Sequence, residues 1–472
     1  MPSQNIIFDT IGAPRTPGVY SEFNTRMAAS SLPGNQNRTV IVGQRLAAGS
    51  VPANTVVDIF SEADAITYFG AGSIAHRMVR SALNANNILS LQAIAADDAG
   101  AGVQATGTTT IAGAATAPGV YTLNVYDDVV SVAYNGGDSA ATVAAALNAA
   151  IAAAPPRIPV TATVLAGVVT LTAKNKGTLG NGIKLAASST PNTGITAAVT
   201  AMANGATDPD ITNTLAAIFT AGHAIVITAF NDATNLGVLR THHTNVSSST
   251  EKRRARGVFA TTTTYAAATT LSSGLNSGRM LNALIPNANG ASYELAASFG
   301  AVAASEPDPA MPLNTLSLNG ITQPPKASWL LNTQIEAALF NGVAPLRLMP
   351  DGTVQIVRAV TTYLTNASGV ADAALLDWTT QGSMDYSANA IEASERTRFG
   401  RSKKTIRTQN SLLDCVYETC IKLQDAEIIQ NVDKTAILIQ NDLVSPTQYD
   451  IKVPLNVVSG LHVIAQRLDL IL

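Results

Sequence analysis

The chain has 472 residues, of which 46% are hydrophobic and 13% are charged, and its formal net charge is −3 at pH 7. This length predicts several domains, and so little charge is typical of a surface that neighbouring molecules cover. The near-neutral balance argues against a chain that coats nucleic acid, because neutralising phosphates requires clustered Lys and Arg. No stretch of about 18 apolar residues and no apolar signal core are present, so we expect neither membrane insertion nor secretion.

The two cysteines, Cys415 and Cys420, lie in a stretch that looks helical. Positions five apart on a helix point roughly 140° away from each other, so one helix cannot bridge them. We therefore predict two free thiols, which are typical of a protein made in a reducing cytosol.

Residues 1–24 are interpreted as an extended arm. Pro14 and Pro17 favour extended backbone and remove amide donors. Such an arm becomes ordered only when it docks on another surface. We expect its apolar residues to make that contact: Ile6, Ile7, Phe8, Val19 and Tyr20.

Residues 25–98 have the pattern of an α/β domain. Two buried strands are predicted at 39–42 and 88–95. Between them, Ser61 and Asp64 have the spacing of a capping box, and Ser73 can cap a second helix.

Residues 99–205 differ from what precedes them. They are rich in Thr, Val, Gly and Ala, and segments bounded by turn residues predict strands. These strands are 120–125, 129–134 and 168–173. One helix is predicted at 138–153, and a glycine-rich turn follows at 176–182. We interpret this region as a small β-rich outer domain inserted into the α/β core.

The α/β pattern resumes over residues 206–448. Strands are predicted at 224–229, 257–260 and 280–285. The helices between them are predicted at 210–220, 231–241 and 264–274. Strands that alternate with helices in this way are typical of a parallel sheet. The segments on both sides of the insert should therefore build one core domain.

The end of the chain mixes helices with strands. Helices are predicted at 333–340, 371–399 and 412–429. Strands are predicted at 436–439, 449–454 and 461–472. We interpret residues 449–472 as C-terminal strands and a second arm. Its apolar tip consists of Leu468, Leu470 and Leu472.

Motifs for catalysis, cofactors and metals are weak or absent. Gly70 and Gly72 offer a G-x-G, but the residues before them predict a helix, whereas a dinucleotide fingerprint follows a strand. No P-loop, G-x-S-x-G, H-E-x-x-H or C-x-x-C motif occurs. His242 and His243 are adjacent, so they do not share a helix face, and a surface or packing role suits them better than metal ligation. We expect no catalytic residue, no cofactor and no metal.

A basic segment stands out at residues 396–407. It holds six cations and no acid: Arg396, Arg398, Arg401, Lys403, Lys404 and Arg407. In a charge-poor chain this concentration favours an acidic partner surface, although a solvated loop also explains it. Nucleic acid fits less well, because Phe399 is the only aromatic there and stacking would need several. A second, weaker basic cluster spans 251–256.

The order of several short motifs resembles contractile bacteriophage tail sheath proteins, in particular the Mu-like group. They are Arg15-Thr-Pro-Gly-Val-Tyr20, Val40-Ile-Val-Gly-Gln44, Tyr68-Phe-Gly-Ala-Gly-Ser73, Thr170-Leu-Thr-Ala-Lys174, Asp308-Pro-Ala-Met-Pro-Leu-Asn314, Gly320-Ile-Thr-Gln-Pro324, Arg358-Ala-Val-Thr361, Phe399-Gly-Arg401-Ser-Lys403 and Ile439-Gln-Asn441-Asp-Leu443. Each motif alone is weak, and their order and spacing across nearly the whole chain carry the resemblance.

The resemblance implies an α/β core with a mixed sheet and a subtilisin-like shape without a protease site. It also implies inserted outer domains and strand-forming arms that pair with neighbouring subunits by β-augmentation. The implied function is structural: subunits polymerise helically around a rigid tail tube and contract to drive the tube through the host envelope. The C-terminal part of the core lies nearest the tube in this family, which favours 396–407 over 251–256 as the tube contact.

The implied partners are further copies of the chain, the tail tube protein, and the baseplate and tail terminator proteins, without direct nucleic-acid contact. The implied location is the virion tail, after assembly in the host cytoplasm. One alternative is the sheath of a phage-derived injection particle. Another is an α/β enzyme with a β-rich accessory domain, which would show convergent carboxylates in a pocket. A small all-β tail tube subunit disagrees with the length and the α/β pattern.

Overall fold

The structure is a computed structural model that describes residues 15–21, 32–35 and 37–470. Its contacts divide the chain into two compact units. The larger unit comprises Asn35–Asp385 and Ser459–Leu472, and the smaller unit comprises Tyr386–Val458 with residues up to Gly34. The domain boundaries predicted above rest on changes in composition and pattern, whereas these units rest on contacts, so the predicted boundaries stay predictions.

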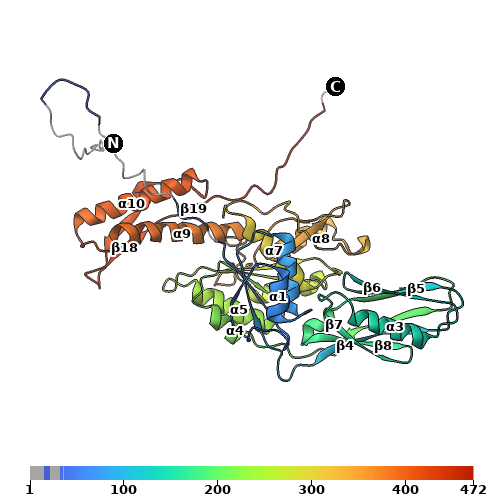
Figure 1. Ribbon diagram of the computed structural model, residues 1–472. Helices are drawn as coiled ribbons and strands as arrows, with labels where there is room; N and C mark the ends of the chain where they lie inside the picture. The colour runs from blue at the N-terminus through green and yellow to red at the C-terminus, as the bar shows by residue number, and fades with distance from the viewer. Residues whose placement is uncertain (1–14, 22–31, 36, 471–472) are drawn as a thin grey trace. The chain divides into compact units, whose positions relative to one another are not determined.

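An eight-stranded open sheet forms the centre of the larger unit (Figure 1). Its strands, in spatial order, are β15 (Val354–Ile356), β14 (Ala344–Leu348), β13 (Met280–Leu284), β12 (Arg256–Thr261), β11 (Ile225–Thr228), β1 (Thr39–Gln44), β3 (Leu91–Ala96) and β2 (Val57–Ile59). All pairs from β14 to β3 are parallel, and the edge strands β15 and β2 are antiparallel to their neighbours. The prediction of a parallel sheet is thus confirmed. Segments before and after the insert share this sheet, since β1 pairs with both β3 and β11.

Helices cover both faces of this sheet, because every residue of β1 and β12 is buried. The helices are α1 (Glu62–Phe69), α2 (Ile74–Ala85), α4 (Thr212–Ile218), α5 (Ala233–Val246), α6 (Tyr265–Leu275), α7 (Ser292–Ser305) and α8 (Asn332–Phe340). α2 and α7 pack together and against β1, whereas α4, α5 and α6 pack on β3, β12 and β13. The predicted capping box begins α1, where the Asp64 amide lies 3.3 Å from Ser61 Oγ.

Residues between β3 and α4 form two antiparallel sheets and one helix, which we call the insert. Its elements are β4 (Gln104–Ala112), β5 (Gly119–Val125), β6 (Asp128–Tyr134), α3 (Ala140–Ala152), β7 (Val160–Leu165), β8 (Val168–Lys176), β9 (Leu185–Ser189) and β10 (Thr196–Ala203). The sheet orders are β10-β4-β8-β7 and β6-β5-β9. Their inner faces meet where Thr109 Oγ1 lies 2.6 Å from Tyr121 Oη. Leu147 of α3 is fully buried and belongs to the same hydrophobic core.

The smaller unit contains two long helices and two small sheets. Its elements are the C-terminal part of α9 (Trp378–Phe399), α10 (Ile406–Asp425), β16 (Ile429–Gln430), β17 (Leu438–Asn441), β18 (Tyr449–Lys452) and β19 (Asn456–Val457). The helices share a core that includes Ala390, Val416 and Leu423. Strand β16 pairs with β19, and β17 pairs with β18, in two-stranded sheets. Cys415 and Cys420 on α10 are buried free thiols, as predicted.

Three predicted elements differ most from the structure. The helix predicted at 371–399 begins at Trp378, because Asp372 binds the Ala374 amide and the Tyr363 hydroxyl in a preceding loop. The helix predicted at 412–429 spans Ile406–Asp425, because Thr405 caps a polar first turn. The strand predicted at 461–472 is absent from the described residues 461–470, since a strand requires a partner for its backbone groups.

Candidate assembly surfaces

The arm residues that the structure describes are solvent-exposed. Val19 is 97% exposed, and Tyr20 is exposed with its hydroxyl 2.9 Å from the Thr16 carbonyl. Leu468 and Leu470 are 91% and 83% exposed. The remaining predicted arm residues lie outside the described residues: Ile6, Ile7, Phe8 and Leu472. Large apolar side chains left in water at a chain end are suited to contact another molecule.

The C-terminal arm has a defined root on the larger unit. His462 Nδ1 accepts a hydrogen bond of 2.8 Å from Asn314, and His462 Nε2 lies 3.5 Å from Asp377. Asp377 in turn makes a bidentate ion pair with Arg358 at 2.8 Å. A Cβ at Gly460 would lie 2.5 Å from Pro312, so the chain can pass there only as glycine. The C-terminal arm is therefore anchored at His462, and exposed apolar residues flank this anchor.

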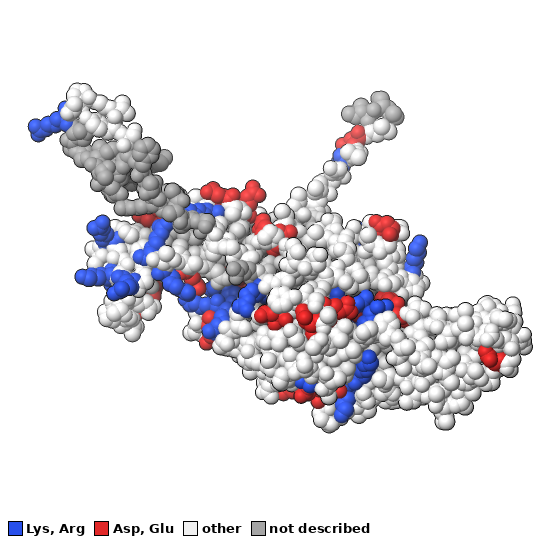
Figure 2. Space-filling view, viewed as in Figure 1, with Lys and Arg blue, Asp and Glu red and all other residues white. Residues whose placement is uncertain are grey.

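The basic segment forms the turn between α9 and α10. Arg396 and Arg398 lie in the last turn of α9, where cations interact favourably with the helix dipole. Thr405 caps α10, and its hydroxyl accepts from the Thr408 amide at 3.1 Å. Figure 2 shows Lys and Arg gathered at the end of the region that carries these helices. We call residues 396–407 the basic tip.

The six cations of the basic tip divide into two groups. Arg398 pairs with Glu418 at 2.7 Å, and this hydrogen bond raises the pKa of Arg398. Lys404 donates to the Gln448 carbonyl at 2.8 Å and lies 4.9 Å from the centre of the Tyr449 ring. The other cations make no ion pair with any residue that the structure describes: Arg396, Arg401, Lys403 and Arg407. These four, which are all exposed, are available for a partner.

The second basic cluster has a different role, because Arg254 and Arg256 are largely removed from solvent, while Arg253 pairs with Glu251. Arg256 is buried, and its guanidinium lies 4.3 Å from the centre of the Trp378 ring. Arg254 lies 4.0 Å from Asp385, which also makes a bidentate pair with Arg279. These contacts fasten the first turns of α9 to the strands β12 and β13. Packing therefore explains the cluster at 251–256.

A buried charge cluster joins the insert to α2 and α7, and sequence reasoning missed it. Arg77 on α2 lies 3.2 Å from Asp128 and 2.9 Å from Glu294, and Arg157 also pairs with Asp128. Burial lowers the pKa of Arg77, but Glu294, Tyr293 and Tyr126 together outweigh burial, so the pKa is raised. The available signal was the acid pair at Asp127 and Asp128 in a region with little charge.

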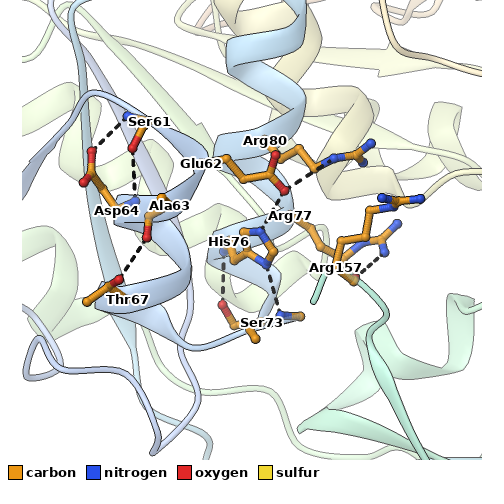
Figure 3. Close-up of polar contacts among 12 residues, drawn as sticks. Ser61, Glu62, Ala63, Asp64, Thr67, Ser73, His76, Arg77, Arg80 and Arg157 are labelled. Atoms are coloured by element: carbon orange, nitrogen blue, oxygen red, sulfur yellow. Dashed lines mark hydrogen bonds and ion pairs between the residues drawn. The ribbon is translucent and has the colours of Figure 1, made fainter. Parts of the chain in front are cut away.

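Beside Arg77, a histidine closes the turn between α1 and α2 (Figure 3). His76 Nδ1 accepts from the Gly72 amide at 3.0 Å, and His76 Nε2 lies 3.2 Å from Glu62. Burial lowers the pKa of His76, so the ring is neutral and donates to Glu62. Gly70 and Gly72 both have positive φ in this turn between two helices. The prediction that this G-x-G lies in a turn at the start of a helix is confirmed.

The adjacent histidines are packing residues. His242 and His243 lie on α5 and are buried, and burial lowers the pKa of His242 to about 4. Both ring nitrogens of His243 lack a hydrogen-bond partner among the described residues. Within the same residues, no group of His, Cys, Asp and Glu could hold a metal, and no helix is long and apolar enough to cross a membrane.

Comparison with known proteins finds similarity to phage tail sheath proteins. Residues 204–362 match the model of the phage tail sheath protein central domain. The Mu-like prophage FluMu tail sheath protein of Haemophilus influenzae is 27% identical, over 99% of this chain and 100% of that protein.

Two crystal structures have the same fold. The sheath tail protein of Desulfitobacterium hafniense superposes with a TM-score of 0.53 at 15% identity, covering 94% of this chain and 97% of that one. The sheath tail protein of Listeria innocua gives 0.51 at 16% identity, covering 92% and 94%. The chain thus carries a phage tail sheath central domain at residues 204–362, is similar from end to end to a Mu-like tail sheath protein, and shares the mixed α/β fold of two sheath tail proteins.

Proposed function

We propose that the chain is a structural sheath subunit that polymerises helically around a rigid tail tube and contracts to drive the tube through the host envelope. The observation that carries the self-assembly is the exposed apolar arm. The exposed fractions of Leu461, Val463, Ile464, Leu468 and Leu470 lie between 71% and 91%. No described residue pairs with this segment as a strand. A second copy can bury these side chains and satisfy the backbone.

The smaller unit offers acceptors for such an arm. The sheets β17-β18 and β16-β19 have only two strands each, so each strand has an open edge within the described residues. Strand addition forms backbone hydrogen bonds without a special side-chain code. Each bond contributes about 0.5–1.5 kcal/mol net, so an arm that makes several bonds is held firmly while its flanks remain able to bend.

The basic tip is the proposed contact with an acidic tube surface, through Arg396, Arg401, Lys403 and Arg407. Charge contacts at a hydrated interface contribute about 0–1 kcal/mol each, so a ring of them is strong in sum and can separate during contraction. Baseplate and tail terminator proteins are the further proposed partners, in a virion tail assembled in the host cytoplasm. The sheath of a phage-derived injection particle is the alternative.

We further propose that residues 99–205 form an outer domain on a core of subtilisin-like shape, and that the protein is not an enzyme. The sheet and helices of the larger unit support the core, and the insert has two sheets of its own. The carboxylates at the insert junction support no hydrolytic role, because Asp128 and Glu294 are both held in ion pairs.

Proline substitution in the C-terminal arm tests the assembly. Proline removes a backbone donor, and successive residues of a strand direct their amides to opposite sides. We expect Leu468→Pro or Asp469→Pro to block the formation of long sleeves, as seen by negative-stain electron microscopy, while Leu468→Ala retains it. Deleting residues 464–472 should also abolish sleeves, and circular dichroism should be unchanged because His462 remains. Sleeves of normal length from both proline variants would contradict strand addition.

A further inference from the structure

The insert uses its charges where it meets the rest of the larger unit. From the start of β4 to the end of β10, its charged residues are Asp127, Asp128, Asp138, Arg157, Lys174, Lys176 and Lys184. Asp128 and Arg157 belong to the cluster with Arg77. Lys174 Nζ donates to the Ala71 carbonyl at 3.0 Å, and Lys184 Nζ donates to the Asn287 carbonyl at 2.6 Å.

Of the remaining charged residues, two lie at the junction and one lies away from it. Asp127 lines the same polar cavity as Arg77, and the Lys176 carbonyl accepts from Gln44 at 2.8 Å. Asp138 alone lies away from the junction, where it accepts from the Asn135 amide. Figure 2 shows the insert almost entirely white. The outward surface of the insert is therefore neutral.

One outward face of the insert is a regular array of threonines. In the sheet β10-β4-β8-β7, Thr200 pairs with Thr108, Thr108 with Thr170, and Thr170 with Thr163. A neighbouring row is formed by Thr106, Thr172 and Thr161. These threonines are exposed or half-buried, whereas the alternate residues of β8 are buried. The opposite side of this sheet faces the core of the insert.

We propose that this outer face of β10-β4-β8-β7 is a contact surface for the insert of a second copy of this chain. The proposal rests on the sheath assembly proposed above. A neutral face gains nothing from a charged partner, whereas an equally neutral surface loses no charge hydration on contact. Threonine has few side-chain conformations to lose, so ordering this face costs little entropy.

The size of the face explains why the contact would be weak outside a sleeve. Three strand spacings of about 4.8 Å and two to three rows about 6.8 Å apart give roughly 200–300 Å². A stable protein interface buries about 800 Å² on each partner. The face is therefore too small to hold two free subunits together. Once the arms tether neighbours, the high effective concentration compensates for the weak contact.

Cysteine labelling of the full chain tests the proposal. Thr200→Cys and Thr163→Cys place a thiol at each end of the threonine row, and Ala149→Cys on the exposed side of α3 is the matched control. The native Cys415 and Cys420 are 0% and 1% exposed and should react slowly. Maleimide labelling of both row variants should slow about tenfold when sleeves assemble, because reactivity follows exposure. The control should keep its rate.

Each outcome decides between the alternatives. Equal labelling before and after assembly would show that the face remains in solvent. Protection of unassembled protein by a neutral polysaccharide such as dextran would assign the face to a glycan instead. If the unmodified chain forms no sleeves, the assembly function itself fails. As a second measurement, Thr108→Lys with Thr170→Lys should make sleeves dissociate at lower denaturant concentration, whereas Ala145→Lys with Ala149→Lys should not.

Discussion

The insert and the basic tip use charge in opposite ways. The insert buries its charges at its junction, where Arg77 meets Asp128 and Glu294, and presents a neutral surface to solvent. The smaller unit keeps a small apolar core between α9 and α10, and the basic tip that joins these helices holds exposed cations such as Arg401 and Lys403. Paired charges at the junction stabilise the attachment of the insert. Exposed cations at the basic tip, by contrast, can form ion pairs with a partner.

The largest expected effect follows from breaking the buried cluster. Arg77→Ala leaves Asp128 and Glu294 near each other without the guanidinium, so we expect the free energy of unfolding to fall by about 3–5 kcal/mol. Urea unfolding followed by circular dichroism measures this change. Arg398→Ala at the basic tip is the matched control, and it should cost less than about 1 kcal/mol, since its pair is largely solvent-screened. If both substitutions lowered the free energy of unfolding by similar amounts, the proposed difference between the insert junction and the basic tip would be wrong.

Acidification should cause a smaller loss of stability, and this loss should arise outside both the insert and the basic tip. All five histidines lie outside the insert and the basic tip. Burial first, and then Arg38, lowers the pKa of His223 to about 4. The unfolded chain binds this proton below pH 6.5 and the folded chain only near pH 4, so stability is lost as pH falls through this window. We expect a loss of about 2–3 kcal/mol from His223 by pH 4.5.

His223→Gln should reduce the pH dependence by that amount while changing stability at pH 7 less. Unfolding curves at pH 7 and pH 4.5 measure the difference. Hydrogen exchange at pH 4.5 should show that amides of β11 and β12 lose protection before those of β4 and β8. Earlier loss of protection in the insert would mean that its junction carboxylates, not the histidines, govern the acid response.

The smallest effect on stability is expected from reversing the exposed cations of the basic tip. Changing Arg396, Arg401, Lys403 and Arg407 to Glu should alter the free energy of unfolding by less than about 1 kcal/mol, since exposed pairs contribute little. Assembly on tail tubes should nevertheless be lost, and wild-type assembly should weaken as salt rises. Co-sedimentation with tubes measures both effects.

The control reverses the two cations that already have partners, Arg398 and Lys404. These changes should disturb the turn more and tube assembly less than reversal of the other four. Normal sheathing by the fourfold variant would assign the basic tip to solvent or to a sister subunit.

Local signals in the sequence predicted much of the fold. The apolar runs of β1, β11, β12 and β13, with helices between them, are sufficient for a parallel sheet because buried strands and amphipathic helices have different periods. Ser61 and Ser73 mark the beginnings of helices because each cap is made within one turn. The basic tip was also visible, since its six cations are neighbours in the chain.

Only the tertiary structure shows which charged side chains are paired within the chain and which remain exposed to solvent. Arg77, Asp128 and Glu294 are distant in the sequence and meet only because α2, β6 and α7 converge. Likewise, Arg398 and Lys404 look like Arg401 and Lys403 in the sequence, but the fold places Glu418 and Gln448 beside them. Local propensity acts over a few residues, whereas the solvation and pairing of a charge depend on whatever the folded chain brings within a few ångströms.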